Sequence, residues 1–252
     1  VMNDTLLLDP VRVLRGPGHS VQLGAVLINQ GVLVGFDDEA RQQALGLGIK
    51  ARPAADQLVA PCLVDPHSVL ETPFSGDQET AVSLRHCAAA GGYGQIALLP
   101  RSSSWRDRPE RLQGFSLDQD QTATVRLHLW GGFSSGGKGD EVAPHGDLLE
   151  HGAIGLADDD AMVPAPLLER GLLLGEMGGC PVLVAPRDPT LQGEGLVREG
   201  VETLRAGWPA DPVTSETLPL GQVLLLHQRH PERQLRLMNL STAAAVQQLS
   251  GC

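Results

Sequence analysis

The sequence predicts an α/β protein in which a parallel (β/α) barrel follows a small antiparallel β-unit. After residue 57, apolar strand-like segments alternate with helical segments about six times, which is typical of parallel strands joined by crossover helices. Residues 1–57 instead hold short strands separated by Gly, Pro and Asn turns. Aromatic residues make up only 3% of the chain, so the core is built from Leu, Val, Ala and Ile, which suits parallel strands.

The first 57 residues are predicted to form one small unit. Its expected strands are Thr5–Asp9, Val11–Leu14, Val21–Ile28 and Gly31–Gly35. A helix is expected over Asp37–Leu47, because acidic residues favour the first turn of a helix.

Residues 58–252 are predicted to form the barrel. The expected strands are Leu58–Asp65, Gln95–Leu99, Thr124–Leu129, Ala153–Ala157, Pro181–Ala185 and Leu235–Met238. The expected helices cover Gln78–Ala90, Asp147–His151, Ala165–Met177, Leu218–Arg229 and a last segment that ends at Leu249. Gly91 and Gly92 are a typical C-terminal stop, and Ser241 or Thr242 is expected to cap the last helix.

Composition and charge argue against nucleic-acid binding, a membrane span and secretion. Nineteen basic and thirty acidic residues give a net charge of -11, which argues against binding a nucleic-acid backbone. No apolar run approaches the ~18 residues that a membrane span needs. No basic flank precedes an apolar stretch at the N-terminus, so a signal peptide is not expected. The four cysteines lie far apart without a C-x-x-C, which favours reduced thiols in a cytoplasmic protein.

Polar residues follow several predicted strands, where the active site of a (β/α) barrel would lie. They include His67, Arg101, the run Asp158–Asp160, Arg187 and Asn239. Carboxylates with a histidine could hold a metal, but Asp158–Asp160 could equally form a helix N-cap and a turn, and the pattern alone favours the turn. The glycine-rich segment Gly131–Lys138 has the wrong spacing for a phosphate-binding loop, which favours a flexible loop.

Several segments resemble the amidohydrolase superfamily, and most closely the dihydroorotases. Residues 59–74 read V-A-P-C-L-V-D-P-H-S-V-L-E-T-P-F, similar to the family's V-x-P-G-L-I-D-x-H-x-H-L-R-E-P-G. The similarity continues in Glu79–Tyr93, in Ala153–Asp159, in Pro181–Asp188 and in Arg236–Thr242, where R-L-M-N-L-S-T resembles H-I-A-H-L-S-T. The resemblance implies a TIM-type barrel and a small N-terminal β-sandwich. The chain stops soon after the sixth strand, so the resemblance implies either a fragment or an incomplete barrel.

The resemblance also implies a chemistry and a set of site positions. In the family, zinc activates a water that attacks a cyclic amide, and a carboxylate moves protons. The matching metal ligands kept here are His67, Asp158 and Asp159. The other family site positions are substituted. Imidazoles are expected at three positions that here hold Val69, Ala185 and Asn239. Two positions that bind the substrate in the family hold Glu71 and Arg101. One imidazole and one or two carboxylates are too few for a closed zinc site, so zinc is expected to be absent or weakly bound and no catalytic residue is assigned.

Three hypotheses for function remain open. The first is a working dihydroorotase, which hydrolyses dihydroorotate to carbamoyl aspartate in pyrimidine biosynthesis. The second, favoured by the substituted positions, is a pseudoenzyme that assembles with aspartate carbamoyltransferase or with itself; this partnership rests on family analogy. The third is a pocket that takes a new ligand through Arg101, Arg187 and His67, although Arg187 could simply pair with a nearby carboxylate.

Overall fold

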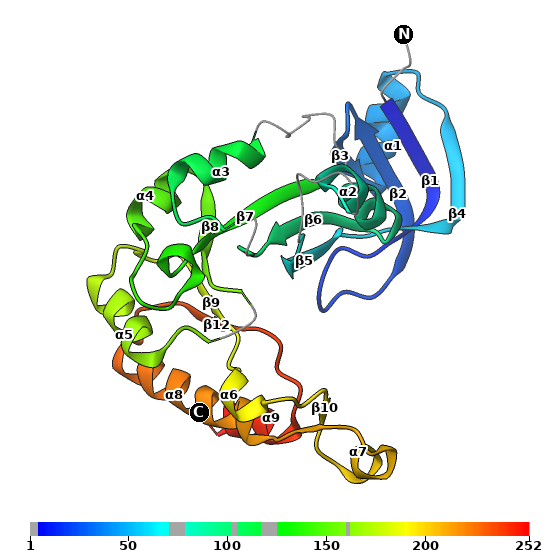
Figure 1. Cartoon of the computed structure of the whole chain (residues 1–252). Helices are drawn as coiled ribbons and strands as arrows, with labels where there is room; N and C mark the ends of the chain where they lie inside the picture. Colours follow the sequence, from blue (N-terminus) through cyan, green and yellow to red (C-terminus); the bar gives the residue numbers. More distant parts are fainter. Residues whose placement is uncertain (1–4, 71–78, 102–104, 117–124, 160–161, 252) are drawn as a thin grey trace. The chain divides into compact units, whose positions relative to one another are not determined.

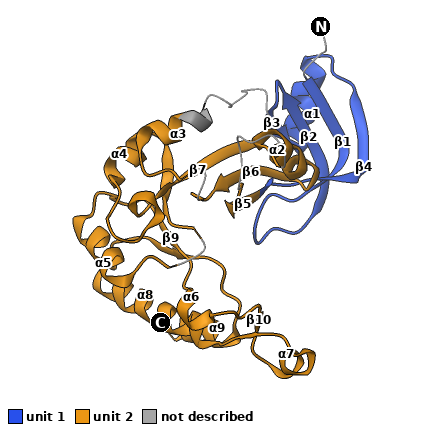
Figure 2. Ribbon diagram, in the orientation of Figure 1, with its two compact units in different colours: residues 1–63 blue, residues 64–252 orange. Residues whose placement is uncertain are grey.

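The computed structural model describes residues 5–70, 79–101, 105–116, 125–159 and 162–251. The chain divides into two compact units, residues 1–63 and 64–252 (Figure 2). No helix in the described parts of the chain is long and apolar enough to cross a membrane.

The first unit is a four-stranded sheet with one helix. Its strands are β1 (Thr5–Val13), β2 (Gln22–Asn29), β3 (Val32–Phe36) and β4 (Ala51–Val59), in the order β3-β2-β1-β4. The β1–β2 and β2–β3 pairs are antiparallel, whereas β4 runs parallel to β1. Helix α1 (Asp37–Gly46) packs Ala40 and Ala44 against Leu7 and Leu27. The resemblance implies a sandwich here, but the described residues of this unit form a single sheet.

The second unit contains a curled sheet of six strands, which confirms the α/β barrel-type fold (Figure 1). The strands are β5 (Leu63–Ser68), β6 (Tyr93–Leu98), β7 (Arg126–Gly132), β8 (Ala153–Ala157), β9 (Val182–Val184) and β12 (Leu235–Leu237). Their order is β12-β9-β8-β7-β6-β5, and the pairs from β6 through β9 to β12 are parallel. Parallel pairing gathers the carboxyl ends of these strands at one edge of the sheet.

Helices connect successive strands of this sheet, and α9 follows the last strand, β12. They are α2 (Ala81–Ala90), α3 (Pro109–Ser116), α4 (His145–Glu150), α5 (Ala165–Leu174), α8 (Thr214–Arg229) and α9 (Ala243–Ser250). Thr80 begins α2 in a capping box with Ser83, and the Thr242 hydroxyl accepts the backbone N–H of Ala245 to begin α9. The predicted stop at Gly91 is confirmed, because that residue caps the end of α2.

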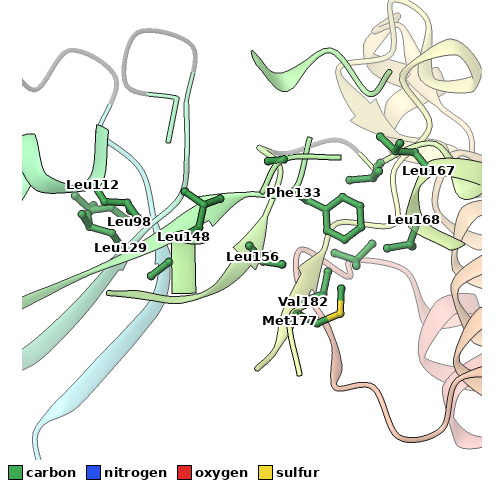
Figure 3. Close-up of a cluster of buried hydrophobic side chains, with 14 of the residues drawn as sticks. Leu98, Leu112, Leu129, Phe133, Leu148, Leu156, Leu167, Leu168, Met177 and Val182 are labelled. Atoms are coloured by element: carbon green, nitrogen blue, oxygen red, sulfur yellow. The ribbon is translucent and has the colours of Figure 1, made fainter. Parts of the chain in front are cut away.

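The main core of the second unit lies between the sheet and these helices. Phe133, Leu156 and Leu168 are fully buried in one cluster, and Figure 3 shows the Phe133 ring among Leu168, Met177 and Val182. Apolar positions of α5 supply the helix side of this contact, as the helical spacing of its leucines predicts.

Several elements differ from the sequence-based expectation. Leu58 and Val59 belong to β4, which pairs with β1, so the first strand of the sheet begins at Leu63 rather than at Leu58. Helix α8 begins at Thr214 and includes Pro219 in its early turns. A connection that the sequence did not predict contains α6 (Pro189–Gln192), α7 (Val201–Ala206) and the two-stranded pair β10 (Val197–Arg198) and β11 (Ala210–Asp211).

Candidate functional site

The candidate site is the edge formed by the carboxyl ends of β6, β7 and β8, continued by β9 and β12. Arg101 follows β6, Ser134 follows β7, and Asp158 and Asp159 follow β8. The pairing of these strands brings residues that are 24 to 58 positions apart in sequence into contact.

Asp158 joins the end of β8 to the end of β7. One carboxylate oxygen accepts the backbone N–H groups of Phe133 and Ser134, both at 2.9 Å, and the other accepts the Ser134 hydroxyl at 2.5 Å. Burial raises the pKa of Asp158, while these hydrogen bonds act in the opposite direction. Both oxygens are therefore occupied by protein donors.

Asp159 points to a different partner. Its Oδ1 lies 2.9 Å from Nη1 of Arg101, and the two side chains are 33% and 29% exposed. The ion pair links the ends of β6 and β8, with β7 between them in the sheet. The structure thus brings together three of the predicted site residues: Arg101, Asp158 and Asp159.

His67 lies in β5 and is half-buried; its backbone N–H donates to the Asp65 carboxylate at 3.2 Å. Val69 follows the strand and is 38% exposed. Glu71 and Asp160 lie outside the described residues.

The ends of β9 and β12 line a separate cavity of about 230 Å³. Ala185 and Asn239, two of the substituted family positions, contribute to its wall, as does Arg187. The Arg187 guanidinium donates to the Gln192 side chain at 2.8 Å. Asn239 has a positive φ of 60°, a conformation that asparagine tolerates better than most residues.

Sequence reasoning missed a buried ionic network beside this cavity. Arg198 donates to the carboxylate of Glu216 at 2.6 Å and pairs with Asp211 at 3.0 Å. Glu216, at only 1% exposure, also accepts the hydroxyls of Ser241 and Thr242 at 2.7 Å each. The N-cap pattern at Thr242 was visible in the sequence, but no local signal connects it to a glutamate 26 residues earlier.

A second missed residue is Arg106, whose guanidinium is almost fully buried. It donates to the carbonyls of Leu98 at 2.6 Å and Trp130 at 3.1 Å, which ties the ends of β6 and β7 together. Burial lowers the pKa of Arg106 to about 9. Trp105 and Trp130 are also buried, so both are core residues.

The glycine-rich segment Gly131–Lys138 begins in the last residues of β7 and continues into a short 3-10 helix, Ser135–Gly137, beside the carboxylate of Asp107. Gly136 and Gly137 have positive φ angles, and the backbone N–H of Gly136 donates to the Asp107 carboxylate at 2.7 Å. Arg111 pairs with the other oxygen of Asp107 at 3.0 Å. Because a carboxylate of the chain already accepts this N–H, the loop offers no preformed phosphate cradle.

Known proteins resemble this chain over most of its length. No model of a known protein family matches the chain. The chain is 32% identical over 261 residues to a "probable dihydroorotase-like protein" of Synechocystis, a match that covers 95% of this chain and 57% of the relative. It is 29% identical over 200 residues to the dihydroorotase of Pelotomaculum thermopropionicum, covering 79% of this chain and 46% of that protein. The chain belongs to the dihydroorotase-like amidohydrolases.

Solved structures share the fold of this dihydroorotase-like chain. A D-hydantoinase superposes with a TM-score of 0.72 at 17% identity, and the L-hydantoinase of Arthrobacter aurescens with 0.67 at 16% identity. Each superposition covers 98% of this chain and 54% and 56% of the respective neighbour. The dihydroorotase-like chain spans about half the length of the relatives that it matches.

The zinc site that the family resemblance implies does not fit the side chains found at this edge. Among the described residues, no group of three or more His, Cys, Asp and Glu side chains could hold a metal ion. The two matching carboxylates already bind protein donors, Asp158 through three hydrogen bonds and Asp159 through Arg101. Structural and catalytic zinc sites use at least three protein ligands with free lone pairs.

Proposed function

We propose that this chain is a non-catalytic member of the dihydroorotase-like amidohydrolases. The family reaction is hydrolysis of the cyclic amide of dihydroorotate to carbamoyl aspartate, and it relies on zinc to activate water. The observation that supports loss of this reaction is the engagement of both matching carboxylates by Ser134, Phe133 and Arg101. A ligand that is already hydrogen-bonded must give up these partners before it can bind a metal.

Zinc content and turnover of dihydroorotate, measured on the same sample, test this proposal. The protein is incubated with zinc, dialysed, and analysed by inductively coupled plasma mass spectrometry. We expect substoichiometric zinc and no ring opening or ring closure. The variant Val69→His serves as a control, because it adds an imidazole two residues from His67 and should raise zinc retention. Stoichiometric zinc together with turnover in the unaltered chain would show that the proposal is wrong.

An exposed apolar surface favours a binding role as the second candidate function. In the connection formed by β10, α7 and β11, Leu196 is 78% exposed, Leu204 83% and Trp208 58%. These three residues lie within one short segment of the chain, and large exposed apolar side chains are a feature of protein interfaces, where tryptophan is enriched. We propose that this surface docks a partner protein, and family analogy makes aspartate carbamoyltransferase the first partner to test.

Light scattering after size-exclusion chromatography distinguishes the possible assemblies. The chain is run alone and with purified aspartate carbamoyltransferase, and the same runs are made with Trp208→Ala. A complex that is weakened by Trp208→Ala supports carbamoyltransferase docking, and a homo-oligomer weakened by it supports self-association. A monomer that does not bind the carbamoyltransferase would contradict this second candidate. Leu45→Ala, at another exposed leucine in the first unit, is the matched control.

A further inference from the structure

Two adjacent residues, Asp158 and Asp159, follow the end of β8, and their carboxylates contact different neighbours. Asp158 accepts donors from the end of β7, whereas Asp159 contacts Arg101 after β6. Two negative charges on consecutive residues each make ionisation of the other less favourable. A positive charge beside either carboxylate therefore favours its ionised form.

Arg101 supplies such a charge. Its Nη1 lies 2.9 Å from Asp159 Oδ1, within the range of a charge-assisted hydrogen bond. Both side chains are about two-thirds buried, which limits screening by solvent. A guanidinium remains protonated throughout the physiological pH range, so this positive charge is permanent.

We propose that the Arg101 guanidinium is the resident cation at Asp159 and excludes a divalent ion from this strand edge. The inference rests on the proposed function and deepens it, since it names the group that takes the electrostatic place of a metal. A divalent ion that approaches Asp159 meets a fixed positive charge and must displace an ion pair that joins β6 to β8. Removing the charge of Arg101 should therefore leave a site that attracts cations.

Two substitutions separate the charge of Arg101 from its hydrogen bond. Arg101→Gln keeps a donor to Asp159 without the positive charge, and Arg101→Met removes both. Arg101→Lys retains the charge. The double variant Arg101→Gln/Asp159→Asn removes the carboxylate as well. Arg229→Met is the matched control, because Arg229 pairs at 2.5 Å with the single carboxylate of Glu169 and not with two adjacent ones.

The readout is the melting temperature in chelator-treated buffer and after addition of Mg²⁺ or Zn²⁺. Arg101→Gln and Arg101→Met should melt below the unaltered chain, and a cation at ten times its dissociation constant should raise their melting temperature by about 3 °C. The unaltered chain, Arg101→Lys, the double variant and Arg229→Met should shift by less than about 1 °C. Mass spectrometry of the dialysed proteins should find more retained zinc in Arg101→Gln than in the unaltered chain.

Two results would overturn the inference: no cation response in either uncharged variant, or an equal response in the unaltered chain. If Arg101→Met does not fold, Arg101→Gln decides alone. Failure of this inference is distinct from failure of the proposed function. Stoichiometric zinc and turnover in the unaltered chain contradict the proposed function, whereas an inert, metal-free chain whose Arg101 variants ignore cations contradicts only the role of Arg101.

Discussion

The carboxylate of Glu216 binds both the hydroxyl and the backbone amide of Thr242, at 2.7 and 2.9 Å, across 26 residues of chain. Glu216 lies in the first turn of α8, and Thr242 is the N-cap of α9. One buried side chain therefore fixes the start of one helix against the start of the next. Burial raises the pKa of Glu216, but the hydrogen bonds from Ser241 and Thr242 outweigh it and hold the pKa below its usual value.

Glu216→Ala should destabilise the second unit strongly. It leaves Arg198 without one of its two carboxylate partners and leaves the Ser241 and Thr242 donors without their acceptor. Each buried donor left without its acceptor costs about 1–3 kcal/mol, and Glu216→Ala removes the acceptor of several. Urea unfolding checks this, with Glu202→Ala as the control, because the Glu202–Arg205 pair is exposed and its loss should cost less than about 1 kcal/mol. Equal effects of the two substitutions would contradict this account of the network.

Gly155→Ala should also destabilise the chain, for a steric reason. A Cβ at this position in β8 would lie 2.5 Å from Cζ3 of Trp130 and would also meet the carbonyl oxygen of Pro181. Such overpacking costs about 1–3 kcal/mol. Gly146→Ala is the matched control, because a Cβ there meets nothing within 4 Å and alanine favours the helix by about 0.5–1 kcal/mol. Thermal denaturation should therefore shift in opposite directions for the two variants; a shift in the same direction would refute this reading.

Stability should fall as the pH drops below about 6.5, because His145 is buried in its neutral form. Its Nε2–H donates to the Phe133 carbonyl at 2.8 Å, and its Nδ1 has no hydrogen-bond partner among the described residues. Burial lowers the pKa of His145, and the Phe133 carbonyl and the charge of Glu176 oppose this only in part. The unfolded chain therefore takes up a proton at a pH where the folded chain does not, and acid favours unfolding.

Urea unfolding at pH 7.5, 6.5 and 5.5 measures this dependence. One proton taken up only on unfolding gives a slope that approaches about 1.4 kcal/mol per pH unit below the unfolded-state pKa. His145→Gln can still donate to the Phe133 carbonyl but does not titrate, so its stability should change less between pH 6.5 and 5.5. If the unaltered chain and this variant have the same pH profile, the buried histidine is not the cause.

Asp158→Asn should loosen the junction of β7 and β8. An amide has a single acceptor oxygen, so it cannot accept from Phe133, from the backbone of Ser134 and from its hydroxyl as the carboxylate does. A buried donor left without a partner costs about 1–3 kcal/mol. Ser134→Ala, which removes only the hydroxyl, should cost less. Chemical denaturation of both variants provides the comparison, and a larger loss in Ser134→Ala would contradict the assigned role of Asp158.

The sequence predicted the elements whose signals are local. The leucine spacing of α5 and the threonine that begins α9 were sufficient to place those helices. The division between β4 and β5 was not predictable, because Leu58 pairs with Arg12 in the first sheet, and that pairing is nonlocal. The partners of the site residues are also nonlocal. The sequence identifies Arg101 as a substituted position, but its contact with Asp159 depends on the order of the strands in the sheet.

We propose that this strand edge does not bind zinc, because both oxygens of Asp158 and Oδ1 of Asp159 already accept hydrogen bonds from protein donors. Isothermal titration of zinc into the metal-free chain tests it most directly. The account predicts no saturable binding at micromolar protein concentration. Saturable binding of one zinc per chain that disappears in Asp158→Asn or Asp159→Asn would contradict it.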